Sequence, residues 1–151
     1  MTALHDLSAV ELLARYRERS LSPVEVARAV LDRIAAWEPH LHATYALDPD
    51  AALAAARVAE SRWLRHVSAG ENVGALEGVP TMIKENIATA GTPVPLGTAA
   101  TELVPAGRDA PPAASAASGS SAYVACRCGS HAAMRSSTAR VTSTGESDRS
   151  R

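Results

Sequence analysis

Apolar and polar residues alternate at helical spacing through most of the first seventy residues. Ser8 and Glu11 form the pattern of a capping box, in which each side chain accepts a hydrogen bond from the backbone N–H of the other residue. Apolar positions then recur every three or four residues. The pattern predicts a first helix that ends by about Ser20.

A stronger helix start follows at Ser22, with Pro23 at the first helical position and Glu25 at the third. The apolar positions behind this start are Val26, Val30, Ile34 and Trp37. Because proline removes an intrahelical hydrogen bond, we expect this second helix to stop before Pro39.

The next segment contains a predicted strand and a third helix. Residues 42–47 are expected to form a short strand, and Asp48 with Pro49 then opens the helix. The apolar stripe predicted for this helix consists of Leu53, Ala56, Ala59, Trp63 and Val67.

Residues 79–84 follow a glycine-containing loop at residues 68–78, and are expected to form a strand with Lys84 at its end. A lone strand cannot satisfy its own backbone N–H and C=O groups. We therefore expect the neighbouring strands to come from polypeptide beyond this sequence or from another molecule.

The composition changes abruptly near Ala114. Every Leu and Ile, both Trp and the single Lys precede this point, whereas the 37 residues after it contain ten Ser, seven Ala and five Arg. So few large apolar side chains cannot offset the entropy of ordering the segment. The chain therefore divides into residues 1–114, a partial domain, and residues 115–151, for which we predict disorder.

Charge and composition give no sign of a nucleic-acid or membrane partner. The net charge is −1 at pH 7, and the N-terminus lacks the basic start and apolar run of a signal peptide. The longest apolar run, residues 51–56, is far too short to span a bilayer. These features predict a cytoplasmic protein with no nucleic acid and no membrane among its partners.

Residues 78–85 combine Gly-Val-Pro with a lysine four positions after the proline, and they follow a helix start at residues 21–34 and an Ala-rich stretch within residues 42–60. This order of segments resembles the amidase signature family, whose members carry a Gly-[Val/Ile]-Pro-x-x-[Ile/Val]-Lys-Asp segment. Glu85 in place of the aspartate is a mild departure. The likeness covers about three quarters of the chain.

The resemblance implies an α/β fold, a mixed sheet covered by helices, of which this chain carries the N-terminal helices and first strands. It also implies hydrolysis of the carboxamide C–N bond of a small-molecule amide by a Ser–cis-Ser–Lys triad. No metal or organic cofactor takes part, and assembly as a homo-oligomer is left open. Lys84 matches the lysine of the triad and is the candidate catalytic residue.

Lysine needs a special environment to act as a base. A free ammonium group has a pKa of about 10.4 and cannot accept a proton at neutral pH. Burial among apolar groups lowers the pKa, and the neighbours expected to provide this burial are Val79, Met82, Ile83 and Ile87. The alternative is that Lys84 is an ordinary solvated lysine at the end of a strand.

The two serines of the triad have no counterpart in the sequence. Residues 119–122 only superficially match the family's Gly/Ser-rich segment, and they follow Lys84 too closely. Cys126 and Cys128 with His131 provide fewer ligands than a structural zinc site needs. The sequence therefore predicts a chain that contains the base without the nucleophile, and no metal site.

Three alternatives remain open. The first is the A subunit of glutamyl-tRNA(Gln) amidotransferase, a member of the same family. This subunit releases ammonia from glutamine for a partner subunit. The second is a non-catalytic module that binds a partner through a sheet edge or an apolar helix face. The third is a fragment without function.

The composition after Ala114 generates a prediction about the coding sequence. GC-rich DNA read out of frame tends to encode Ser, Ala, Arg and Gly, so our hypothesis for the change is a frameshift or a truncated gene model. We expect another frame of the downstream DNA to resume an amidase-like sequence with a Gly/Ser-rich segment. Translation of all three frames checks this, and the absence of such a frame would contradict a frameshift.

Overall fold

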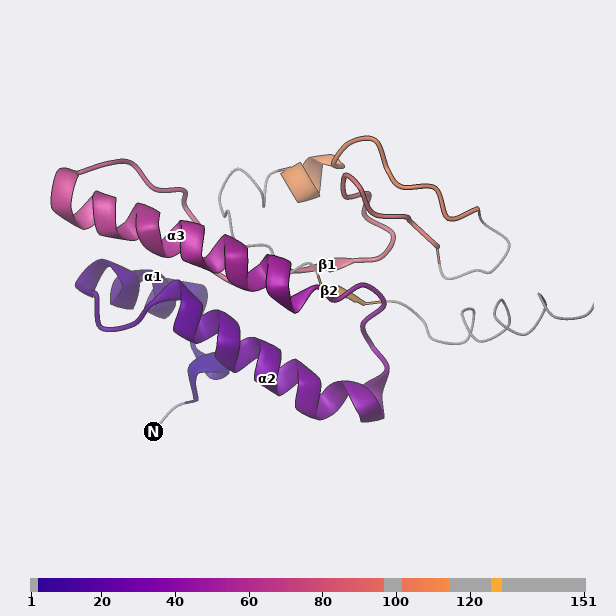
Figure 1. Ribbon diagram of the computed structural model, residues 1–151, viewed down its shortest axis with the longest axis horizontal. Coiled ribbons are helices and arrows are strands. Elements are labelled where there is room, and N and C mark those ends of the chain that lie inside the picture. Colours follow the sequence, from indigo (N-terminus) through magenta and orange to yellow (C-terminus); the bar gives the residue numbers. More distant parts are fainter. Residues whose placement is uncertain (1–2, 97–101, 115–125, 129–151) are drawn as a thin grey trace, which may run out of the picture.

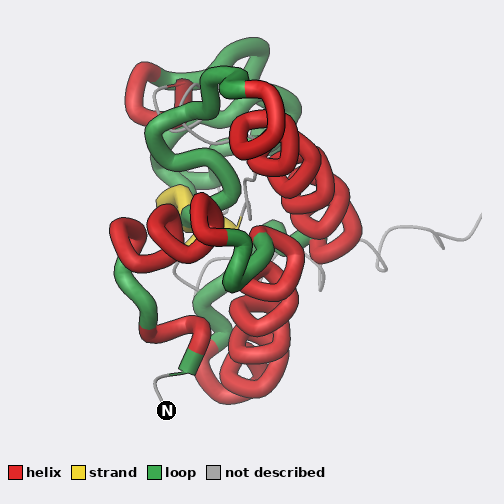
Figure 2. Tube along the Cα trace, turned by 90° about the vertical axis from the view of Figure 1, so that its left-hand side faces the viewer, coloured by secondary structure: helices red, strands yellow, loops and turns green. Residues whose placement is uncertain are grey.

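The computed structural model describes residues 3–96, 102–114 and 126–128. Its elements are a short 3-10 helix η1 (Leu4–Asp6), the helices α1 (Ala9–Glu18), α2 (Pro23–Leu41) and α3 (Pro49–Ala69), and the strands β1 (Met82–Lys84) and β2 (Cys126–Cys128). Helices α2 and α3 pack along each other, with α1 beside them (Figure 1). The described residues after α3 run mainly as loops around the two strands (Figure 2).

The capping box predicted at Ser8 is confirmed, and a second one forms at the helix start predicted at Ser22. The N–H of Ser8 donates to Glu11 Oε2 (2.8 Å), and the N–H of Ser22 donates to Glu25 Oε2 (2.8 Å). The reciprocal bonds from the glutamate N–H groups to the serine hydroxyls are also present. Helix α1 ends at Glu18, and the capping residue Arg19 adopts a left-handed backbone conformation (φ 59°).

The prediction that the second helix stops before Pro39 is wrong. Helix α2 continues through Pro39 to Leu41, and the N–H of His42 donates to the carbonyl of Glu38 (2.8 Å) to close the last turn. Pro39 lies in the final turn of the helix. Its missing N–H still removes the hydrogen bond to the carbonyl of Ala35, but only two helical residues follow Pro39, so little of the helix depends on that turn.

The strand predicted over residues 42–47 does not form, and the structure has only a single bridge residue there, Thr44. The Glu38 carboxylate accepts the N–H groups of Ala43 (3.2 Å) and Thr44 (3.0 Å), which a strand ladder would otherwise use. Burial raises the pKa of Glu38, but the bonds from Thr44 and Ala43 outweigh it and hold the pKa below its ordinary value.

The face that α3 buries consists of small residues and one tryptophan: Ala52, Ala56, Ala59 and Trp63. The predicted stripe was therefore correct in its centre, although Leu53 is only half-buried and Val67 is exposed. Alanines on the contact face let two helices approach closely. No helix of the described part is both long and apolar enough to cross a membrane.

Strand β1 pairs in parallel with β2, in the register Met82 with Cys126 and Lys84 with Cys128. The predicted strand is thus confirmed over its last three residues. The expectation that its neighbours lie outside the sequence is wrong for one edge, because β2 belongs to the segment predicted to be disordered. The rest of that segment, residues 115–125 and 129–151, lies outside the described residues.

The described structure is mostly helical, and within it the two strands are the only sheet. The mixed sheet covered by helices, expected from the resemblance, is therefore represented here by its helices and by the lysine strand. The main core cluster joins η1, α1, α2 and α3 to the start of the β1 segment, through the buried residues Leu7, Leu12, Tyr16, Val26, Trp63 and Val79.

The turn before β1 depends on a glycine. Gly78 has φ +80°, a conformation that other residues rarely adopt. A Cβ placed there would lie 2.8 Å from Pro23 Cγ and 3.4 Å from Ala59 Cβ. The glycine therefore serves both the backbone conformation and the close approach of the turn to α2 and α3.

These contacts predict the effect of Gly78→Ala. The left-handed conformation alone should cost about 1 kcal/mol, as in Gly70→Ala, where φ is +70° and a Cβ meets no atom within 4 Å. Overlap with Pro23 should cost Gly78→Ala roughly 1–3 kcal/mol more. Urea unfolding of both variants measures the difference in the free energy of unfolding. Equal losses would show that the overlap with Pro23 is relieved at no energetic cost.

Candidate functional site

The residues from Met82 to Glu85 alternate between the two sides of β1. Met82 and Lys84 are exposed, whereas Ile83 (5% exposed) and Glu85 (7%) are buried. Successive side chains of a strand point to opposite faces, so Ile83 and Glu85 turn to the interior. The predicted apolar enclosure of Lys84 is therefore absent among the described residues, because Ile83 and Val79 face the core instead.

Two side chains from different helices hold the turn that leads into β1. The indole Nε1–H of Trp63, on α3, donates to the carbonyl of Glu77 (3.0 Å). The hydroxyl of Tyr16, on α1, donates to the carbonyl of Gly78 (3.1 Å). Both donors are buried, and their rings are in contact with centroids 5.9 Å apart. Neighbouring peptide groups of the turn are thus fixed from two directions.

The side chain of Glu77 adds a third connection to α3. It is only 3% exposed, and Oε2 lies 3.4 Å from Nη1 of Arg62. A buried carboxylate requires a partner of opposite charge or hydrogen bonds. Sequence reasoning did not identify this role, although an acidic residue directly before the Gly-Val-Pro motif was a signal that could have revealed it.

The backbone turns sharply after the lysine. The N–H of Ile87 donates to the carbonyl of Lys84 (3.0 Å), which ends the strand. Further on, the N–H of Ala90 donates to Asp109 Oδ1 (2.7 Å) and joins this loop to residues 102–114. The hydroxyl of Thr89 is buried there and has no hydrogen-bond partner within the described part of the chain.

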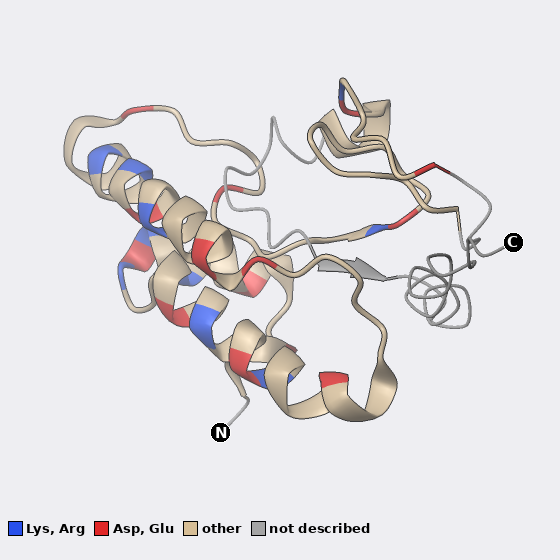
Figure 3. Ribbon diagram, turned by 45° about the vertical axis from the view of Figure 1, so that its right-hand side comes forward, with Lys and Arg blue, Asp and Glu red and all other residues tan. Residues whose placement is uncertain are grey.

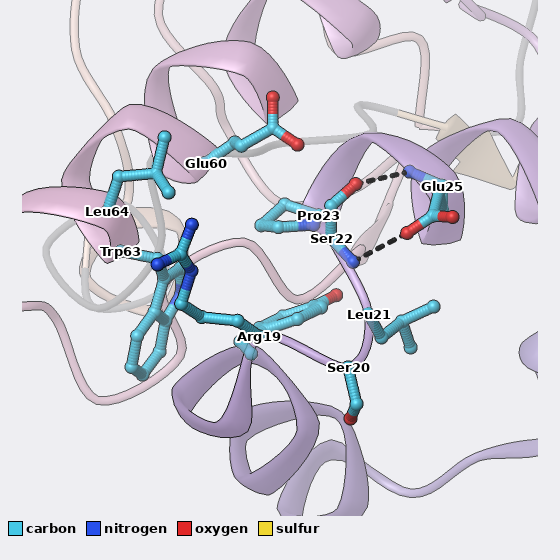
Figure 4. Close-up of a pocket in the computed structure, with 10 residues that line it drawn as sticks. Arg19, Ser20, Leu21, Ser22, Pro23, Glu25, Glu60, Trp63 and Leu64 are labelled. Carbon is cyan, nitrogen blue, oxygen red and sulfur yellow. Dashed lines mark hydrogen bonds between the residues drawn. The ribbon is translucent and has the colours of Figure 1, made fainter. Parts of the chain in front are cut away.

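A hollow of about 330 Å³ lies where the α1–α2 connection meets α3 (Figure 4). Its lining includes Tyr16 and Trp63, and the dashed bonds in the figure are those of the capping box between Ser22 and Glu25. Lys84 is not among the residues that line it. We interpret this hollow as part of the helix junction that supports the turn.

The residue of β2 in register with Lys84 is Cys128. Residues 119–122 and His131 lie outside the described part, whereas Cys126 and Cys128 form the ends of β2. The described ranges hold no cluster of three or more His, Cys, Asp or Glu residues that could bind a metal ion. Charges of both signs are interspersed along the three helices (Figure 3).

The turn and the lysine strand lie in the part of the chain that a protein-family model matches. The family model described as Amidase matches residues 25–115. The chain belongs to the amidase signature family. The matched region contains the turn, β1 and Lys84, and it ends next to the change of composition near Ala114.

Curated relatives include the A subunit of glutamyl-tRNA(Gln) amidotransferase. The protein from Acidothermus cellulolyticus is 44% identical over 97 residues, which are 64% of this chain and 18% of that protein. The protein from Chloroflexus aurantiacus is 41% identical over the same length. The chain therefore spans less than a fifth of the length of these amidase relatives.

Solved amidase structures share the fold of this segment. A bacterial aryl acylamidase of the amidase signature family superposes with a TM-score of 0.68 at 27% identity, over 85% of this chain and 25% of that chain. A fatty acid amide hydrolase superposes with a TM-score of 0.55 at 30% identity, over 64% of this chain and 16% of that chain.

The bond from Tyr16 to the turn predicts the outcome of Tyr16→Phe. Removing the hydroxyl leaves the buried carbonyl of Gly78 without this donor, so the free energy of unfolding should fall by about 1–3 kcal/mol at pH 7. Urea denaturation measures the loss. Tyr45→Phe, which removes a half-buried hydroxyl bonded to the Pro93 carbonyl, is the control for a tyrosine outside the turn and should lose less.

Tyr16→Phe should also change how the stability of the chain depends on alkaline pH. Burial raises the pKa of Tyr16 above its unfolded value of about 10, so the folded chain keeps a proton that the unfolded chain loses. The stability of the unmodified chain should therefore fall as the pH rises above about 10, and Tyr16→Phe should lack this contribution. An equal alkaline loss in both proteins would contradict a buried, protonated Tyr16.

Proposed function

We propose that residues 1–114 carry the general-base segment of an amidase that hydrolyses a carboxamide to an acid and an amine or ammonia. Lys84 is the base. The observation that carries the proposal is the placement of Lys84 on the open face of β1, directly after a turn fixed at two carbonyls.

The proposed reaction divides the chemistry between this segment and the rest of an amidase domain. A serine hydroxyl attacks the amide carbonyl, and its proton passes through a second serine to Nζ of Lys84. Backbone N–H groups stabilise the oxyanion, and the proton then goes to the departing amine. Water hydrolyses the acyl-serine that remains, which releases the acid and restores the serine hydroxyl. Both serines belong to polypeptide outside the part that matches the family.

The side chain of Lys84 is exposed in this chain, and the proposal has to account for that exposure. Lysine accepts a proton only in its neutral form, and removal from water favours that form. The described residues cover only the opposite side of the strand, through Ile83 and Glu85. We propose that the remainder of an amidase domain covers the Lys84 side and supplies the apolar enclosure that the sequence led us to expect.

A more specific candidate is that the chain is a segment of the A subunit of an amidotransferase and takes part in the release of ammonia from glutamine. The 44% and 41% identity to such subunits supports this candidate. The aryl acylamidase, at 27% identity, supports an amidase of broader specificity. Hydrolysis of glutamine compared with an anilide, by the same enzyme preparation, separates the two.

The role of Lys84 is tested in a chimera that joins residues 1–114 to the remaining polypeptide of the Acidothermus cellulolyticus relative. Lys84→Ala should lower kcat by about 100-fold or more, because proton transfer belongs to the transition state. Lys84→Arg should fail almost as badly, since arginine stays protonated. Hydrolysis of a simple amide and of glutamine measures both.

Two controls accompany this experiment. Arg57→Ala removes an exposed cation from α3 and should leave kcat unchanged. The 151-residue chain alone should show no turnover, because a base without nucleophile or oxyanion hole gives little catalysis. Retention of most activity by a well-folded Lys84→Arg chimera would show that Lys84 is not the base.

A further inference from the structure

The hollow at the helix junction, which supports the turn before β1, also has the size and lining of a small-molecule site. Its volume of about 330 Å³ lies at the lower end of the range of about 300–1,000 Å³ that such sites span. The end of α1, the α1–α2 connection and one face of α3 form its walls (Figure 4). The lining combines charged, hydroxyl and apolar side chains, so the chemistry of a ligand can be read from the groups that remain available to it.

Most polar groups of the lining are already bonded within the chain. Tyr16 and Trp63 donate to carbonyls of the turn before β1, and the hydroxyl of Ser20 donates to a carbonyl of α1 (3.4 Å). Ser22 and Glu25 are bonded to each other in the capping box of α2. These groups shape the hollow but have little bonding capacity left for a ligand.

Two charged side chains of the lining, Arg19 and Glu60, are not bonded in this way. Within the described part of the chain, the guanidinium of Arg19 and the carboxylate of Glu60 take part in no hydrogen bond or ion pair. Arg19 extends from the end of α1 toward α3, from which Glu60 projects (Figure 4). The hollow therefore presents one cation and one anion to a ligand.

Both charged residues occupy positions that stability alone does not favour. Arg19 has φ 59°, at the end of a helix, where glycine adopts the left-handed conformation more readily. Glu60 is half-buried, and removing a carboxylate from water without a partner is unfavourable. Backbone strain of this kind is concentrated at binding sites, and a ligand with two charges would supply the partners that both groups lack.

The remaining lining is apolar and partly rigid. Pro23 and Trp63 are buried in the packed helices, whereas Leu21 is half-buried and Leu64 is 47% exposed. An aliphatic group placed against these side chains would be removed from water together with them. Because the buried residues already have fixed positions, this wall requires little ordering when a ligand binds.

We propose that the hollow binds a free α-amino acid with an aliphatic side chain. Arg19 donates to the carboxylate of the ligand, Glu60 accepts from its ammonium group, and the aliphatic side chain lies against Leu21 and Leu64. A ligand with a single charge would leave one of the two protein groups without a partner. Lys84 does not line the hollow, so this site does not depend on the proposed hydrolysis of amides.

Isothermal titration calorimetry of the 151-residue chain with L-leucine tests the proposal. We expect saturable binding at one site. Leucinamide lacks the carboxylate and 4-methylpentanoate lacks the ammonium group, so each should bind at least about tenfold more weakly through loss of a charge-assisted hydrogen bond. Absence of saturable binding of L-leucine, or equal affinities for the three compounds, would overturn the proposal.

Arg19→Gly and Glu60→Gln assign the two contacts separately. Glycine adopts the left-handed conformation without strain, so Arg19→Gly should fold, bind L-leucine about tenfold more weakly and no longer prefer it to leucinamide. Glu60→Gln keeps the length of the side chain and should likewise lose the preference for L-leucine over 4-methylpentanoate. Retention of both preferences by the folded variants would show that these residues do not bind the ligand.

Arg57→Gln is the matched control, since Arg57 is an exposed cation of α3 that does not line the hollow. It should bind L-leucine as the unmodified chain does, and an equal loss with Arg19→Gly would contradict a specific contact. Circular dichroism verifies the fold of each variant. The titration requires no catalysis, so an inactive chimera would refute the proposed function without affecting this site. Conversely, failure of L-leucine to bind would leave the role of Lys84 untouched.

Discussion

Two hydrogen bonds to neighbouring carbonyls determine where the lysine strand begins. Trp63 on α3 donates to Glu77, and Tyr16 on α1 donates to Gly78. Carbonyl groups in a buried turn must find donors, and here the donors are large side chains that also form the centre of the core. The helices and the Lys84 strand are therefore parts of one packed unit.

The glycine and the alternation of the strand follow from that unit. Gly78 has no side chain because Pro23 and Ala59 occupy the space in which a Cβ would lie. From this fixed point the strand buries Ile83 and leaves Lys84 on the opposite side. The Gly-Val-Pro to Lys motif thus has a physical meaning, since the glycine positions the strand and the strand orients the lysine.

Hydrogen bonds between residues close together in the sequence could be predicted from the sequence, whereas contacts between residues far apart in it could not. The capping boxes at Ser8 and Ser22 depend on residues three positions apart, so the pattern alone reveals them. The bond between Tyr16 and Gly78 joins residues 62 positions apart, and no spacing indicates it. Pro39 was misjudged because the cost of a proline depends on its place in a helix. The pairing of β1 with Cys126–Cys128 was missed because composition describes a segment and not its contacts.

Hydrogen exchange along the native chain tests most directly whether the turn, the lysine strand and the helices form one unit. The N–H of Val79, bonded within the turn, and the amides of Met82–Lys84 should open with about the same free energy as those of α1 and α3. Exchange of these amides at the rate of an unstructured loop, while the helices stay protected, would show that Tyr16 and Trp63 do not hold the strand in place.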